Sequence, residues 1–227
     1  MRRFAPRNSD SDALWEDPDV MRGVRERETG RIEAFSDAVL AIVLTLLVLE
    51  LLPKGAQTPE QLLDAWPTYL AYLTAFVTVG SVWLNHNEAI SRLHRVNPVV
   101  LVLNLGLLLG ASLVPWPAAL VSEALQEGSR ADQIAALVVF GGVAVVISVP
   151  WVALDLYLAR HRELLNAAED VAWMRRHALV SVATLVVAAA SIALSFVSPL
   201  AALLLYLPVF VAFVLARLLE RRSFGSP

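Results

Sequence analysis

Long apolar stretches alternate with short polar segments along most of the chain. Six stretches have about the 20 residues needed to cross the hydrocarbon core of a bilayer. They cover residues 34–52, 66–85, 98–121, 132–159, 173–196 and 199–219. This pattern predicts an all-α membrane protein whose six transmembrane helices form one domain over residues 31–219.

The composition supports a membrane protein and excludes several kinds of chemistry. Of the 227 residues, 57% are hydrophobic and 17% are charged, which is more apolar than a soluble domain requires. The absence of cysteine excludes disulfides and thiolate sites. Asp37, His86 and Asp155 are conceivable metal ligands, but no two of them have tight ligand spacing on one helix. We therefore expect no metal, no cofactor and no enzymatic activity, since no nucleophile–base pair is apparent either.

Positive charges predict the orientation of the chain in the membrane. When the six spans are assigned alternately, sixteen of the 18 Lys and Arg residues fall on one side, and only Lys54 and Arg130 fall on the other. The positive-inside rule then places both termini in the cytoplasm, with the spans in the cell membrane. Residues 1–30 carry many charges of both signs and no apolar signal segment, so we expect a poorly ordered cytoplasmic tail. Residues 220–227 are expected to form a short cytoplasmic tail.

Polar residues within the spans gather in one leaflet. Asp37 lies near the start of the first span, where a carboxylate is costly and is read first as functional, with a cap or an interfacial residue as the alternative. Four further residues fall at a similar depth: Asn85, His86, Asn104 and Asp155. Because buried polar groups avoid large penalties by pairing, we expect a shared network, with Asp155 at the headgroup boundary as the alternative.

The first span has two different faces on a helical wheel. At about 100° per residue, Ile42, Leu46 and Leu49 fall within about 60° of one another, and Thr45 flanks them. Asp37 lies about 120–140° from Ile42. The face that carries Ile42, Leu46 and Leu49 is entirely aliphatic. It is either a functional surface or an ordinary helix-packing face.

Three motifs together resemble a known family. The first span opens with Arg31-x-x-x-Phe35-Ser36-Asp37. The second contains Trp83-Leu84-Asn85-His86, and the third contains Asn104 followed by Pro115-Trp116-Pro117. Over residues 31–120 the chain resembles the transmembrane-protein-175 family of potassium channels, in its single-repeat prokaryotic form.

The resemblance implies a potassium-selective cation channel. Four subunits would place their first helices around a central pore, and closed symmetry is the usual arrangement of such assemblies. Ile42 would form the constriction, Leu46 and Leu49 would continue the lining, and Thr45 falls on the threonine layer of the family. Potassium is then the permeant ion, and Glu50 either concentrates cations in an outer vestibule or has no role.

The resemblance also implies polar contacts that hold the first helix. Arg31, Ser36 and Asp37 would contact Trp83 and His86 of the second span. The helical wheel, however, places Arg31 on the side of Ile42, so its contact needs a bent helix start or a long reach.

A second function class is a proton-coupled secondary transporter. Asp37, His86 and Asp155 would then relay protons, which the ionisable residues within the spans favour. The lack of detectable repeats or discontinuous helices disfavours this class.

Overall fold

The computed structural model describes residues 18–51, 58–166, 170–208, 210–211 and 214 of the chain. Within these ranges the secondary structure is helical, apart from an isolated bridge between Leu93 and Leu165. The elements are α2 (Pro18–Leu47), η1 (Val48–Leu51), α3 (Pro59–Asp64), α4 (Trp66–Ser91), α5 (Pro98–Ser112), α6 (Pro115–Gln126), α7 (Arg130–Arg160), η2 (Arg162–Leu164), α8 (Asp170–Ser195) and α9 (Pro199–Leu204).

Four helical stretches in the described ranges are long and apolar enough to cross a membrane. They are Trp66–Ser91, Pro98–Gln126, Arg130–Arg160 and Trp173–Ser195. These stretches coincide with the predicted second to fifth spans. The predicted first span lies in α2 and η1, and the sixth begins with the shorter apolar helix Pro199–Pro208 and continues beyond the described residues. The fold is that of an all-helical, multi-pass membrane protein, and the count of six crossings remains a prediction.

Two element boundaries differ from those predicted. α2 begins at Pro18, so the second part of the segment expected to be a tail is helical, and proline is favoured in a first helical turn. Residues 1–17 and the predicted tail at 220–227 lie outside the described residues. The predicted third span is interrupted at Leu113 and Val114. Pro115 follows at the start of α6, and its missing N–H removes a hydrogen bond that would continue α5 into α6.

Side-chain caps fix where several helices start. Asn97 accepts a hydrogen bond from the backbone N–H of Val100, and Pro98 occupies the first turn of α5. Ser129 and Asp132 form a capping box at the start of α7. These caps satisfy backbone donors that the helix itself leaves unpaired.

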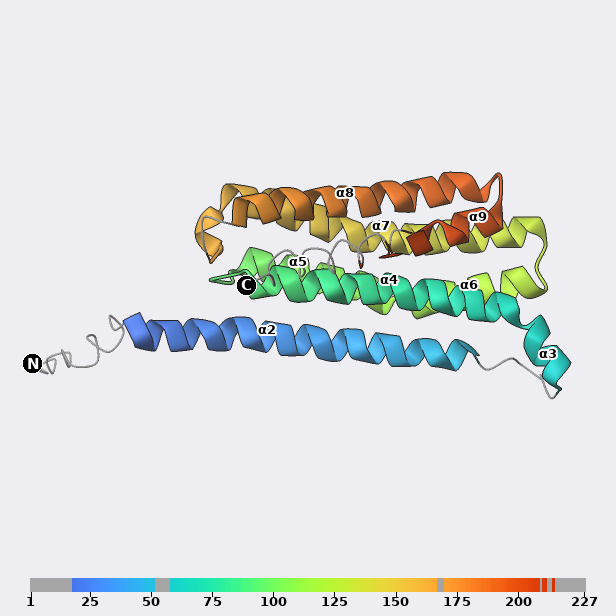
Figure 1. Cartoon of the computed structure of the whole chain (residues 1–227), viewed down its shortest axis with the longest axis horizontal. Coiled ribbons are helices and arrows are strands. Elements are labelled where there is room, and N and C mark those ends of the chain that lie inside the picture. Colours follow the sequence, from blue (N-terminus) through green and yellow to red (C-terminus); the bar gives the residue numbers. More distant parts are fainter. Residues whose placement is uncertain (1–17, 52–57, 167–169, 209, 212–213, 215–227) are drawn as a thin grey trace, which may run out of the picture.

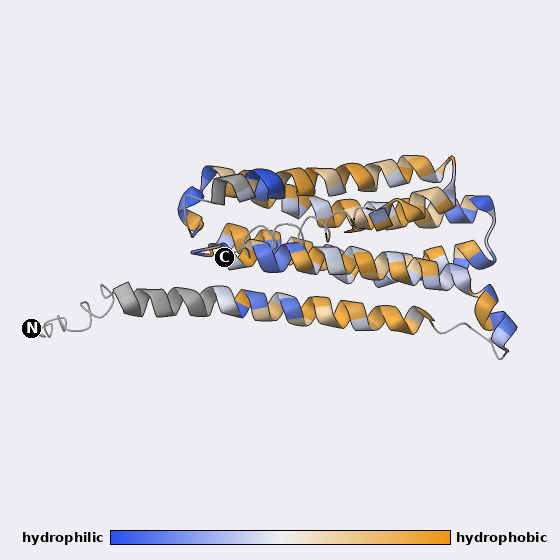
Figure 2. Ribbon diagram, in the orientation of Figure 1, coloured by the Kyte–Doolittle hydropathy of each residue, from blue (hydrophilic) through white to orange (hydrophobic). Residues whose placement is uncertain are grey.

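The helices run side by side in an elongated bundle. α2 lies along one edge and α8 along the opposite edge, with α4, α5, α6, α7 and α9 between them (Figure 1). α2 packs against α4 and α5, and α7 packs against α5, α6 and α8. Figure 2 shows hydrophilic residues mainly at the two ends of the bundle and hydrophobic residues along its length. This distribution suits a bundle whose axis follows the membrane normal.

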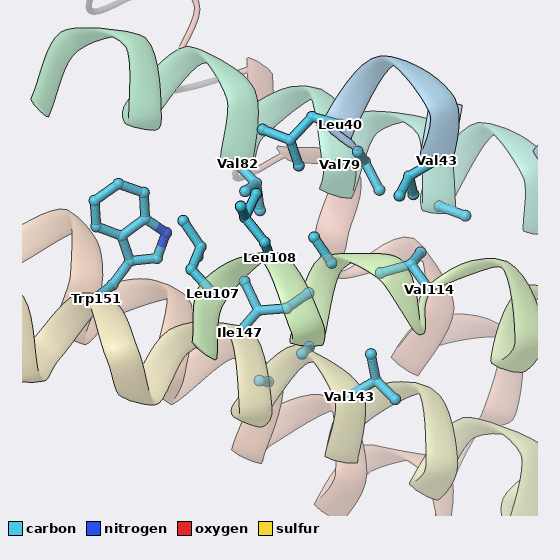
Figure 3. Close-up of a cluster of buried hydrophobic side chains, with 14 of the residues drawn as sticks. Leu40, Val43, Val79, Val82, Leu107, Leu108, Val114, Val143, Ile147 and Trp151 are labelled. Carbon is cyan, nitrogen blue, oxygen red and sulfur yellow. The ribbon is translucent and has the colours of Figure 1, made fainter. Parts of the chain in front are cut away.

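The core is aliphatic and closely packed. A Cβ added to Gly110 of α5 would lie 2.9 Å from Cγ1 of Ile147 and 3.1 Å from its backbone nitrogen. Only glycine therefore lets α5 and α7 approach this closely, as small residues do at membrane helix interfaces. Side chains of α2, α4, α5 and α7 meet in one buried cluster (Figure 3).

Candidate functional site

One face of α2 is bound into the bundle. Leu40, Val43 and Leu47 are buried, and Leu40 and Val43 lie beside Val79 and Val82 of α4 (Figure 3). The spacing of three and four residues is that of one helix face. The helix is therefore fixed in rotation by its aliphatic contacts.

The opposite face of α2 is not covered by the residues of the subunit that the structure describes. Ile42 and Leu46 of α2 are 58% and 44% exposed, and Leu49, which continues the same side into η1, is 57% exposed. They form one continuous stripe, and Thr45 is exposed beside them. This is the stripe that the helical wheel predicts. Three small residues, Ala34, Ala38 and Ala41, are also exposed on α2.

The hydroxyl of Thr45 has a fixed orientation. Its Oγ1 donates a hydrogen bond to the backbone carbonyl of Ile42 at 2.8 Å. Because the proton is committed to its own helix, the oxygen offers only its lone pairs to a neighbour. The exposed face of α2 thus carries an oxygen that accepts and does not donate.

A buried polar chain ties α2 to α4 and α5. Asn104 Nδ2 of α5 donates to Ser36 Oγ at 3.0 Å, and Asn104 Oδ1 lies 2.8 Å from His86 Nε2 of α4. An amide oxygen only accepts, so His86 Nε2 carries the proton. All three side chains are buried. Asn104 is therefore the central member that joins the three helices.

Two more polar contacts lie next to this chain. Trp83 Nε1 donates to Asp37 Oδ1 at 2.9 Å, and Asn87 Nδ2 donates to Glu33 Oε1 at 3.3 Å. Both contacts join α4 to α2 and are more exposed than the Ser36–Asn104–His86 chain. The start of the apolar part of α2 is thus held by polar contacts to two neighbouring helices.

Comparisons with known proteins identify the family. The family described as endosomal/lysosomal potassium channel TMEM175 matches residues 31–115. A potassium channel from Streptomyces collinus is 39% identical over 147 residues, which cover 63% of this chain and 70% of that one. This chain belongs to the TMEM175 family. A potassium channel from Chamaesiphon minutus is 37% identical over 141 residues, which cover 58% of this chain and 68% of that one.

A solved TMEM175 structure has the same fold. The crystal structure of a lysosomal potassium-selective channel TMEM175 homolog from Chamaesiphon minutus matches with a TM-score of 0.69 and 31% identity. The match covers 84% of this chain and 98% of that one. The likeness therefore extends well beyond the motif-bearing helices.

The TMEM175 motif residues divide into contacting and exposed groups. Asp37 bonds Trp83, which is one of its two expected partners, and Ser36 reaches His86 only through Asn104. Arg31 is exposed and forms no polar contact with Trp83 or His86 in the described part of the chain, in contrast to the expectation.

The remaining motif residue is Phe35, which is also exposed. The helical wheel explains the exposure of both Arg31 and Phe35. This part of α2 is a regular helix, and residues 31, 35 and 42 lie on its uncovered side. Glu50, the candidate for a vestibule, has a side chain that lies outside the described part of the structure.

A second buried pair in this TMEM175 chain was missed by sequence reasoning. His177 Nδ1 of α8 lies 2.6 Å from Asp155 Oδ1 of α7, and both side chains are buried. Trp151 lies between this pair and the other network, with its ring edge-on to both His177 and His86. Asp155 therefore belongs to a separate polar pair and not to one network with Asp37. The available signal was a histidine within the predicted fifth span.

Proposed function

We propose that this protein is a potassium channel in which α2 of four identical subunits lines a central pore. The family assignment and the potassium channels among its relatives support the activity. The observation that carries the pore arrangement is the uncovered aliphatic face of α2, which has the same residues that the family resemblance assigns to the pore.

The exposed alanines of α2 favour contact with other helices over contact with lipid. Ala34, Ala38 and Ala41 recur at three- and four-residue spacing beside the aliphatic stripe. Small residues let helix backbones approach closely, and they are typical of helix–helix contacts in membranes. Four copies of α2 can therefore come together with Ile42, Leu46 and Leu49 toward the axis.

Ile42 is proposed as the constriction of this pore. A bare cation in an aliphatic ring faces a desolvation cost on the order of tens of kcal/mol. A ring of four Ile42 side chains must therefore either exclude water and close the path, or widen enough for a partly hydrated ion. The Ile42 ring would then be both the gate and the selectivity filter. Leu46 and Leu49 would lengthen the apolar part of the pore that excludes water.

The Thr45 hydroxyls give the pore a preference for cations. Each donates its proton to the Ile42 carbonyl, so four Thr45 oxygens would present lone pairs toward the axis. Lone pairs coordinate potassium and repel anions. The Thr45 layer would act one turn away from the Ile42 ring, toward the outer side if both termini are cytoplasmic.

Purified protein in planar bilayers tests this proposal. Asymmetric potassium should give single-channel currents that reverse near the potassium equilibrium potential. Ile42→Asn should raise cation leak and reduce the preference for potassium over sodium, because a polar ring lowers the barrier for every cation. Leu109→Asn is the matched control, since Leu109 of α5 is 62% exposed and is not part of the α2 face. Unchanged current and selectivity in Ile42→Asn would remove Ile42 from the axis.

The absence of cysteine permits a direct test of the pore position. Ile42→Cys places the only thiols of the channel in one ring, and thiolates bind soft metal ions. Cadmium should block Ile42→Cys current and leave wild type and Leu109→Cys unaffected. Mass photometry of the same preparations should give the mass of four subunits of 24.7 kDa plus detergent. A dimer or monomer that still conducts would contradict the tetrameric pore.

A further inference from the structure

A cavity lies inside the subunit, away from the uncovered face of α2. It has a volume of about 80 Å³ and is lined by residues of α4, α7 and α8 and by Tyr206 and Phe210, which follow α9. Most of its wall is apolar, with Trp151 at one side and Asn85 among the polar residues. Pockets with an apolar wall and a few placed polar groups are the usual form of small-molecule sites.

Four Ser and Thr hydroxyls on the cavity wall already donate their protons to backbone carbonyls. Thr78 and Ser81 donate to the carbonyls of Thr74 and Val77, one turn earlier on α4. Ser148 and Thr184 donate to backbone carbonyls of their own helices in the same way. Each of these four hydroxyls therefore keeps only acceptor lone pairs for the cavity, whereas the hydroxyl of Tyr206, which also lines the cavity, is buried without a hydrogen-bond partner among the described residues.

Asn85 is the one carboxamide on this wall. It is 9% exposed, and its side chain forms no hydrogen bond with the described residues. A primary amide offers two donors and an acceptor, and leaving them unpaired away from water is unfavourable. The Asn85 amide is therefore available to pair with an occupant of the cavity.

We propose that this cavity binds a small neutral amphiphile, namely a short apolar body with one hydroxyl that pairs with the Asn85 amide. Charged ligands are disfavoured because no Asp, Glu, Lys, Arg or His lines the cavity. A water-sized probe fills roughly 10–15 Å³, so about 80 Å³ accommodates an occupant on the order of six non-hydrogen atoms. The site does not depend on the proposed channel activity.

The position of the site on α4 gives it a route to the α2 contacts. At about 100° per residue, Asn85 lies about 160° around α4 from Trp83, which bonds Asp37 of α2. Trp151 lines the cavity and also meets the ring of His86 edge-on. An occupant would therefore contact α4, which carries Trp83, and also Trp151, which meets His86. Trp83 and His86 belong to the contacts that hold the start of the apolar part of α2.

Trifluoroethanol is a suitable probe because it has six non-hydrogen atoms, one hydroxyl and a fluorine signal. Full-length protein in lipid nanodiscs should broaden the fluorine resonance saturably, beyond the effect of empty nanodiscs. Ser148→Leu and the milder Ala144→Val fill the cavity, and both should remove the excess broadening. Asn85→Ala should weaken binding about two- to tenfold, the equivalent of one net hydrogen bond.

Val149→Leu is the matched control, since Val149 neighbours Ser148 in sequence but is exposed on the outside of α7. It should bind trifluoroethanol like wild type. Equal saturable broadening in the two filling variants would place the ligand elsewhere, and broadening no greater than that of empty nanodiscs would mean that the cavity holds water only. Either result would overturn the proposal.

Discussion

Replacing Asn104 with leucine should destabilise the subunit more than any change at the exposed contacts between α2 and α4. The substitution keeps a branched side chain but removes hydrogen bonds to Ser36 Oγ and His86 Nε2. Hydrogen bonds between membrane helices contribute about 0.6 kcal/mol on average and up to about 1.7 kcal/mol. Ser36 and His86 are also buried and would be left without this partner, which adds to the cost. We therefore expect a loss of about 2–4 kcal/mol in the free energy of unfolding.

Equilibrium unfolding of the purified protein in mixed detergent–SDS micelles measures this loss. Asn87→Ala is the matched control, because Asn87 also pairs with α2 through Glu33 but is exposed, and it should cost less than about 0.5 kcal/mol. A double-mutant cycle of Asn104→Leu with Ser36→Ala should be strongly non-additive. If Asn104→Leu proves as stable as Asn87→Ala, the buried chain does not hold α2 and the reasoning fails.

Three further predictions concern the neighbouring groups and the function class. Asp37→Ala and Trp83→Phe should be less than additive by about 1 kcal/mol in a double-mutant cycle of unfolding, whereas full additivity would mean that their hydrogen bond contributes nothing. Asp155→Leu should cost about 1–3 kcal/mol in unfolding, and adding His177→Phe should recover part of it, because no buried polar partner then remains. Under symmetric potassium, an imposed pH gradient should leave the reversal potential at zero, and a shift with the proton gradient would favour a proton-coupled transporter.

The helix positions and the two faces of α2 were accessible from sequence because both depend on local periodicity. Ile42, Leu46 and Leu49 share a face at helical spacing, and all three are uncovered in the structure. The wheel also placed Arg31 on that side, against the contact implied by the family resemblance. What periodicity cannot give is the occupant of an uncovered face, since lipid and a second subunit both accept aliphatic side chains.

The polar pairs were less predictable because they join helices that are distant in the chain. Similar depth grouped Asp155 with Asp37, yet Asp155 pairs with His177 across the contact between α7 and α8. Depth is one coordinate, whereas pairing also requires the rotation of each helix and the identity of its neighbour. The side chain of Asn104 points toward neighbouring helices that carry suitable partners, and it pairs with both Ser36 and His86.

The one-sided attachment of α2 gives the helix the mechanics of a lever. Its polar contacts at Ser36 and Asp37 form a pivot, and beyond them its contacts with the described residues are aliphatic. Ile42 stands about 8 Å from this pivot and Leu46 about 14 Å, at 1.5 Å of rise per residue. A tilt of about 5° would then move Ile42 by about 0.7 Å and Leu46 by about 1.2 Å. If α2 tilts about this pivot, Leu46 moves farther than Ile42, so a gate at the proposed Ile42 ring needs a larger tilt than a gate at Leu46 does for the same displacement.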